Sequence, residues 1–131
     1  MMQYTINNKN LPEVGELKGL FEQTSWAKNR SLEGVEKLLQ KTEVFVVVRD
    51  TNTEQLIGFG RALSDGVYRA LLDDIVIEAS YRKRGLGKRI VQELLDQLQD
   101  VEQVFLNTKP ELEVFYNEFG FTKTKALTMS L

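Results

Sequence analysis

The stretch Tyr81-Arg82-Lys83-Arg84-Gly85-Leu86-Gly87-Lys88-Arg89 joins a strand-like run to the most regular helical pattern in the chain. Five of the chain's 17 basic residues fall within eight positions of it, far more than an even spread would place there. Its two glycines permit positive φ angles and close backbone approach, and the first turn of the following helix leaves N–H groups unpaired. With the positive end of the helix dipole added, the stretch predicts an anion-binding loop suited to a polyphosphate.

The spacing excludes two familiar phosphate-binding loops. A Walker A loop ends in Gly-Lys-Ser/Thr, whereas Arg89 follows Lys88 here. A dinucleotide-binding loop requires a third small residue where Ile90 stands. A nucleic-acid module is also disfavoured, because aromatic residues do not alternate with the basic ones and the net charge of the chain is −2.

Length and composition narrow the chemistry. The chain has 131 residues, of which 42% are hydrophobic, and this predicts a single domain over 1–131. It has no Cys and no His, so thiolate catalysis is excluded, no metal is expected, and acid–base chemistry falls to carboxylates, Tyr or Lys. The longest apolar run, 44–48, is too short to span a membrane, and the N-terminus does not resemble a secretion signal. We expect a cytoplasmic protein.

Apolar spacing predicts a mixed α/β fold with helices on both faces of one sheet. Asp65-Gly66 is a hairpin signal between two strand-like runs, and 74–106 forms a strand–helix–strand unit. The expected helices are 11–22, a second one capped by Ser31, 86–98 and 111–119, and the expected strands are 44–48, 56–63, 67–78, 101–106 and a last strand or hairpin over 121–131.

Three stretches together resemble the GCN5-related N-acetyltransferase (GNAT) family. The glycine loop matches the family pattern Arg/Gln-x-x-Gly-x-Gly/Ala at Arg82-Lys83-Arg84-Gly85-Leu86-Gly87. Asp73-Asp74-Ile75-Val76-Ile77 is similar to the family's fourth strand, and Phe115-Tyr116-Asn117-Glu118-Phe119-Gly120-Phe121 to the end of its late helix. The resemblance covers roughly 44–121 and implies a mostly antiparallel sheet in which a parallel fourth and fifth strand splay apart.

The resemblance also implies a binding mode for acetyl-CoA as co-substrate. The loop from Arg82 to Lys88 would hold the pyrophosphate, the backbone of Ile75, Val76 and Ile77 would pair with the pantetheine arm, and Asn107 would contribute to the same site. The last apolar stretch, Ala126 to Leu131, would support a homodimer, because it is otherwise a short exposed edge.

For the chemistry we expect direct attack of an amine on the thioester in a ternary complex. Tyr116 is the candidate acid for the departing thiolate, and Asp74 is the candidate base. Phe21, Trp26 and Asp73 are candidates for the acceptor pocket. Each aromatic residue has a plain packing role as its alternative, and Asp73 and Asp74, being adjacent in a strand, are expected to point to opposite faces.

The sequence therefore predicts an N-acetyltransferase that acts on an amine of a small molecule or a protein. The alternative is a non-catalytic acyl-CoA-binding module that keeps the loop without turning over substrate. An aminosugar, an aryl-alkylamine, a polyamine and a protein lysine all remain open as acceptors.

Overall fold

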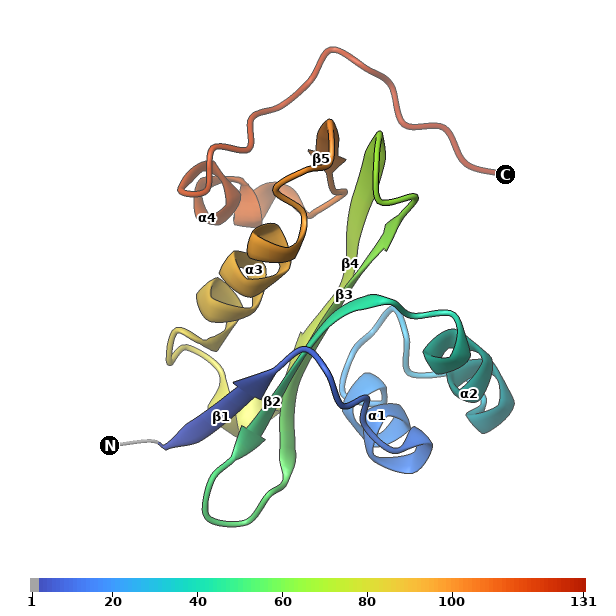
Figure 1. Cartoon of the computed structure of the whole chain (residues 1–131), viewed down its shortest axis with the longest axis vertical. Coiled ribbons are helices and arrows are strands. Elements are labelled where there is room, and N and C mark those ends of the chain that lie inside the picture. The colour runs from blue at the N-terminus through green and yellow to red at the C-terminus, as the bar shows by residue number, and fades with distance from the viewer. Residues whose placement is uncertain (1–2) are drawn as a thin grey trace.

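The computed structural model describes residues 3–131, which form one five-stranded sheet in the order β1-β2-β3-β4-β5 with helices on both faces (Figure 1). The first four strands pair antiparallel and β4 pairs parallel with β5, which confirms the predicted mixed sheet. The elements are β1 (Tyr4–Asn7), α1 (Val14–Phe21), α2 (Leu32–Gln40), β2 (Val44–Asp50), β3 (Leu56–Ser64), β4 (Arg69–Ile77), a 3-10 turn (Ala79–Tyr81), α3 (Leu86–Gln97), β5 (Gln103–Phe105), a 3-10 turn (Pro110–Leu112) and α4 (Glu113–Asn117).

The sheet separates two apolar layers. On one face α1 and α2 cover Phe45, Val47 and Phe59, and on the other α3 covers Val46 and Val48 (Figure 1). Because both faces are covered, β2 needs apolar residues at successive positions, which explains the unbroken run that predicted this strand. Within residues 3–131 no helix is long and apolar enough to cross a membrane.

Local sequence signals that predicted the element ends were largely confirmed. The Ser31 side chain accepts a hydrogen bond from the Gly34 N–H at 2.9 Å and so caps α2. Gly66, with φ of 80°, turns the chain between β3 and β4, and Asp65 Oδ1 accepts N–H bonds from Val67 and Tyr68. The hairpin therefore forms where the Asp-Gly pair predicted it.

Both chain ends differ from the prediction. The N-terminal segment Tyr4–Asn7 forms β1 against β2, because its short β-forming sequence completes an edge that β2 leaves open. The last strand or hairpin expected over 121–131 is wrong, since this segment forms no helix or strand and its Leu127 and Met129 are exposed. The homodimer expected through these residues stays a prediction.

The late helix is shorter than the pattern over 111–119 suggested. A 3-10 turn over Pro110–Leu112 leads into α4, which ends at Asn117. Gly120, with φ of 93°, then reverses the chain direction so that Phe121 packs back against the apolar layer under α3.

Helix α3 approaches the sheet closely at Gly60 in β3. A Cβ atom built on Gly60 would lie 2.5 Å from Ile90 Cγ2 and 3.2 Å from Leu94 Cδ1, both on α3. A larger side chain here would force the Ile90 side chain, or α3 with it, to move. The position of α3, and of the loop that opens it, therefore depends on this glycine.

We expect Gly60→Ala to lower the free energy of unfolding by about 1–3 kcal/mol, because it overpacks a close contact between helix and sheet. Urea unfolding followed by circular dichroism measures the change. Gly15→Ala in α1 is the matched control, since a Cβ there meets no atom within 4 Å. It should be neutral or stabilising by up to about 1 kcal/mol, and a similar loss in both variants would contradict the packing argument.

Candidate active site

The glycine loop places open space at the N-terminus of α3. Gly85 is the N-cap of this helix with φ of 85°, and a Cβ atom there would meet nothing within 4 Å. Lys83 also has a positive φ, 63°, so the backbone folds into a tight turn before the helix begins. Unpaired N–H groups of a first helical turn, in front of open space, are the geometry of an anion site.

Side-chain contacts fix the start of this loop. The Tyr81 hydroxyl donates a 2.7 Å hydrogen bond to Asp50 Oδ2 at the end of β2, and the Arg84 guanidinium lies 5.7 Å from the Tyr81 ring centroid. Arg82 Nε donates to the Ile77 carbonyl at 3.0 Å. The bond from Tyr81 lowers the pKa of the Asp50 carboxyl and, reciprocally, raises the pKa of Tyr81.

The predicted loop residues fall into two groups. Arg82, Lys83, Arg84 and Lys88 are exposed, whereas the Leu86 side chain is buried, so Leu86 offers only its backbone to a ligand. A Cβ on Gly87 would lie in ordinary contact with Ile77 Cδ1 at 3.4 Å. The second glycine therefore faces Ile77 and Phe115 rather than open space, and the packing of α3 there has room for a Cβ atom.

Strands β4 and β5 separate soon after they begin. They pair from Arg69 with Gln103 to Leu71 with Phe105, and no register pair joins β5 to the remaining residues of β4. This confirms the splayed parallel pair. The free edge of β4 runs from Leu72 to Ile77, toward the glycine loop.

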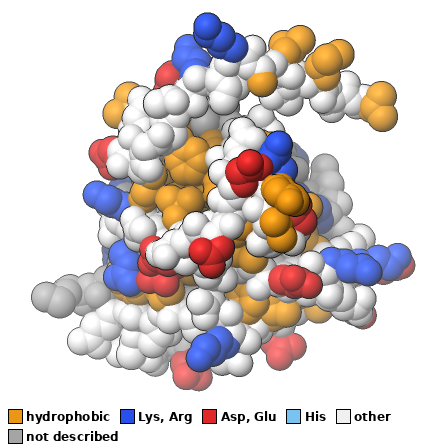
Figure 2. Space-filling model, turned by 45° about the horizontal axis from the view of Figure 1, so that its top comes forward, with side chains coloured by type: hydrophobic (Ala, Val, Ile, Leu, Met, Phe, Trp, Pro, Cys, Tyr) orange, Lys and Arg blue, Asp and Glu red, His pale blue; other side chains and the backbone are white. Residues whose placement is uncertain are grey.

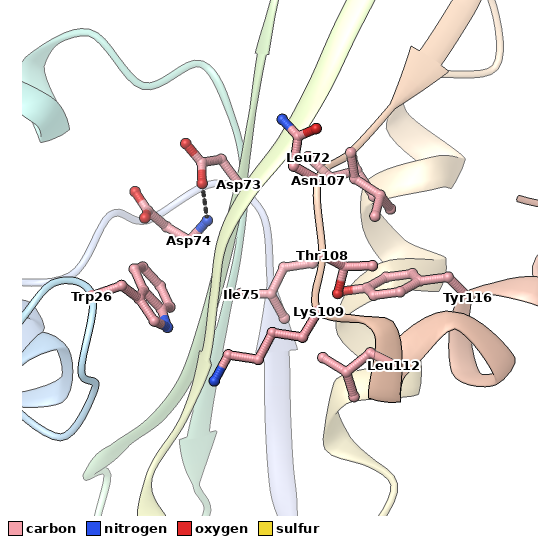
Figure 3. Close-up of a pocket in the computed structure, with 11 residues that line it drawn as sticks. Trp26, Leu72, Asp73, Asp74, Ile75, Asn107, Thr108, Lys109, Leu112 and Tyr116 are labelled. Atoms are coloured by element: carbon pink, nitrogen blue, oxygen red, sulfur yellow. Dashed lines mark hydrogen bonds between the residues drawn. The ribbon is translucent and has the colours of Figure 1, made fainter. Parts of the chain in front are cut away.

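A cavity of about 460 Å³ opens at the separation of β4 and β5 (Figure 3). Trp26, Asp73 and Asp74 line one side of β4, and Thr108 and Tyr116 line the other side. The full lining is Trp26, Leu72, Asp73, Asp74, Ile75, Leu106, Asn107, Thr108, Lys109, Leu112 and Tyr116. Of the three residues predicted to face pantetheine, Ile75 lines this cavity, and Val76 and Ile77 follow along the strand.

A bulge in β4 turns two adjacent carboxylates to the same side of the strand (Figure 3). Phe59 pairs with Val76 and Arg61 with Asp73, so two residues of β4 stand opposite the single residue Gly60. Asp74 has φ of 53°, a left-handed conformation that breaks the strand's alternation. The expectation that Asp73 and Asp74 point to opposite faces is therefore wrong, since both line the same cavity (Figure 3).

Two arginines neutralise the buried carboxylate of Asp74, whose side chain is fully buried. Arg61 Nε donates to Asp74 Oδ2 at 2.6 Å, and Arg30 Nη1 contacts the same oxygen at 3.0 Å without the alignment of a hydrogen bond. Asp73 lies 3.5 Å from Arg61 Nη2, and its Oδ1 accepts the Asp74 N–H at 2.9 Å. Asp74 Oδ1 has no hydrogen-bond partner within residues 3–131.

The segment between α1 and α2 supplies one of its two predicted aromatic residues to the cavity. Trp26 lines it and is 51% exposed. Phe21 does not: its ring is fully buried and packs edge-on against Phe59 at 6.3 Å, so the prediction that it lines the acceptor pocket is wrong. The Arg30 guanidinium lies 4.7 Å from the Phe21 ring centroid and 5.7 Å from that of Trp26.

Tyr116 reaches the cavity from α4. Its ring packs edge-on against Phe115 at 4.9 Å and Phe121 at 6.1 Å, and burial raises the pKa of its hydroxyl above the ordinary 10.0. Asn107 lines the cavity close by, and its Oδ1 accepts a 3.2 Å bond from Thr128 Oγ1. Tyr116 therefore holds a neutral hydroxyl at the site, as a proton donor must at neutral pH.

Sequence reasoning missed Arg30, Arg61 and Lys109. Arg61 stands in an apolar strand pattern, where a single charged residue predicts a buried partner, and that signal was available. Arg30 and Lys109 lie in polar segments with nothing in the sequence to distinguish them from other exposed cations.

Comparison with known proteins agrees with this geometry. The family model of the acetyltransferase (GNAT) domain matches residues 14–129. An uncharacterized N-acetyltransferase, ycf52, of Pyropia yezoensis is 33% identical over 125 residues, which cover 92% of this chain and 70% of that protein. The chloroplastic GCN5-related N-acetyltransferase 1 of Arabidopsis thaliana is 28% identical over 123 residues, covering 92% of this chain and 60% of that one.

A solved GNAT-family acetyltransferase from Streptococcus pneumoniae TIGR4 has the same fold. Its TM-score is 0.78 at 21% identity, and the match covers 98% of both chains. Fold, glycine loop and separated strands together define an acyltransferase. The chain belongs to the GNAT acetyltransferase family.

We expect Arg61→Met to destabilise the protein strongly, because it leaves the buried Asp74 with one cationic neighbour instead of two. Removing one member of a buried ion pair costs about 3–5 kcal/mol of unfolding free energy. Because Arg30 still pairs with Asp74 in the variant, we expect a loss at the lower end of that range, about 3 kcal/mol. Urea unfolding at pH 7 measures it. Arg69→Met is the control, since its pair with Glu102 is exposed on both sides and should cost at most about 1 kcal/mol. Equal losses would show that the network does not hold this part of the fold.

Proposed function

We propose that this chain transfers the acetyl group of acetyl-CoA to a primary amine by direct attack in a ternary complex. The observation that carries the proposal is the free edge of β4, which leads from the N-terminus of α3 to a cavity lined by an accessible carboxylate, Asp73, and a tyrosine, Tyr116. An extended ligand with an anionic end matches this arrangement along its whole length.

The residues present fit acetyl-CoA. The pyrophosphate would accept N–H bonds from the first turn of α3 at Gly85, with Arg82, Arg84 and Lys88 around it as exposed cations. The pantetheine arm carries amide groups, and the unpaired backbone of β4 from Ile75 onward offers donors and acceptors to them. The thioester would then lie where the strands separate, beside the cavity.

The transfer needs a nucleophilic amine, a polarised carbonyl and an acid. The amine nitrogen forms a bond to the thioester carbon while the carbon–sulfur bond breaks, and backbone N–H groups of β4 hold the carbonyl oxygen. A carboxylate or a water takes the amine proton; of the two candidate carboxylates Asp73 is the accessible one, because the Asp74 side chain is fully buried and paired with both arginines. The Tyr116 hydroxyl gives its proton to the sulfur, and the tyrosine regains one from solvent.

The alternative, a module that binds acyl-CoA without turnover, predicts binding but no transfer. Tyr116 favours an enzyme, because its neutral hydroxyl lines the cavity that the Asp73 carboxylate also lines. That residues 1–131 act as one domain, and that the protein works in the cytoplasm, stay predictions.

Gly85→Glu should abolish acetyl-CoA binding, because it places bulk and negative charge in front of the α3 N-terminus. Titration calorimetry measures the affinity. Gly66→Glu is a matched control: its φ of 80° is close to the 85° of Gly85, and its Cβ also meets nothing within 4 Å. Both variants should therefore lose similar stability, and only Gly85→Glu should lose the ligand. Unchanged affinity in a folded Gly85→Glu protein would reject the loop as the binding site.

Tyr116→Phe should lower kcat while leaving acetyl-CoA affinity within a few-fold of wild type. General acids typically contribute about 10²–10⁴-fold, so we expect a fall of at least ~30-fold in single-turnover experiments, which exclude product release. Because burial raises the pKa of Tyr116, its deprotonation should lower the wild-type rate only at a higher pH than the one at which an exposed tyrosine, with its ordinary pKa of 10.0, titrates. A variant within about twofold of wild type would assign the proton to water instead.

A further inference from the structure

The charged groups around the cavity do not add up to an anionic site. Asp73, Asp74 and Lys109 line the cavity, and Arg30 and Arg61 contact the two carboxylates directly. Three cations therefore face two carboxylates. Charges this close sum at the position of a bound ligand, because a cavity between strands screens them less than open solvent does.

The acceptors available for a cationic ligand are correspondingly few. Asp73 has 43% of its side chain exposed but already bonds the Asp74 N–H through Oδ1. Asp74 offers none, because its side chain is fully buried and its Oδ1, although without a partner within residues 3–131, has almost no accessible surface. Asp73 is therefore the one cavity-lining carboxylate that can accept from an ammonium or amine group, and the lining residues leave none for a second.

The opposite parts of the cavity are apolar or basic. The Trp26 ring is half-exposed, and the Arg30 guanidinium packs against both this ring and the ring of Phe21. In Figure 3 the Lys109 side chain extends from the β5 side of the cavity toward Trp26. A second positive charge on the ligand would therefore lie near Lys109 and the arginines, whereas a flat apolar group would lie against Trp26.

We propose that the acceptor is a monoamine with a flat apolar body, and that Lys109, with Arg30 and Arg61, excludes diamines and polyamines. The inference rests on the proposed acetyltransferase function and selects among the acceptors which that function leaves open. The same cations favour the neutral form of a bound amine, which is the form that attacks a thioester.

Four amines test the proposal with the full-length chain and acetyl-CoA. Pentylamine and cadaverine differ only in the second amino group, and both are short enough to lie within the cavity. Phenethylamine and cyclohexylethylamine differ only in aromaticity. We expect kcat/KM for pentylamine to exceed that for cadaverine by about tenfold or more, and phenethylamine to exceed cyclohexylethylamine by about threefold.

Variants assign these preferences to residues. Lys109→Gln should narrow the gap between pentylamine and cadaverine by about threefold, and Lys9→Gln, an exposed lysine in the segment after β1, should leave it unchanged. Trp26→Leu should remove the preference for phenethylamine. Because Trp26 is the chain's single tryptophan, quenching of its fluorescence measures amine binding without turnover.

The outcomes separate the two levels of the argument. Turnover of cadaverine as fast as pentylamine, or a Lys109→Gln variant with an unchanged gap, overturns the acceptor class and leaves the acetyltransferase proposal intact. If none of the four amines is acetylated while acetyl-CoA still binds, the proposed function fails and the acceptor class fails with it.

Discussion

Strand β4 has backbone groups on its β5 side that no strand pairs with. It pairs with β5 only as far as Leu71, so the backbone N–H and C=O groups on that side from Leu72 to Ile77 have no strand to pair with. Buried backbone groups without partners are costly, and a ligand that supplies partners is favoured at such an edge. The open edge, the cavity beside it and the loop at its end are thus consequences of one missing strand contact.

The bulge in β4 and the close approach of α3 occur at the same point of the sheet. Gly60 stands opposite the two bulged residues, and its missing side chain is what lets Ile90 of α3 reach the sheet. The same short region therefore determines how closely α3 packs on the sheet, and the position of the loop follows from that packing. It also determines the direction of the Asp74 side chain, and with it the arrangement of charges beside the cavity. A single glycine in β3 couples the two ends of the candidate site.

The sequence predicted most of the elements and the loop, because these follow from local spacing. The unbroken run in β2, the Asp-Gly hairpin and the glycines before α3 each act within a few residues. Gly58 and Gly60 within a strand indicate a close approach or, equally, a bulge; the structure has both at Gly60, but the sequence does not show that the extra residue belongs to β4. Arg30 and Arg61 were missed for a related reason: their partner Asp74 is 44 and 13 positions away, and only the fold brings them together.

The last segment, 121–131, shows the opposite error. Its apolar residues predicted a strand, but a strand forms only by pairing with another edge, and in the structure this segment pairs with none. Phe21 was misplaced by similar reasoning, because proximity to Trp26 in the chain does not determine which of two neighbouring aromatic residues turns inward. Pairing and burial are properties of the partner as much as of the residue.

The bond between Tyr81 and Asp50 gives an ordinary surface turn an unexpected importance. Asp50 uses one carboxylate oxygen to cap the turn after β2, where the Asn52 N–H bonds it at 2.8 Å, and the other to hold Tyr81, 31 positions later. Such turns usually tolerate insertions and exchange freely between related proteins. Here a change in the length of the turn between β2 and β3 would move Asp50, and with it Tyr81 at the start of the glycine loop. The length of this turn should therefore vary less in evolution than its exposure suggests.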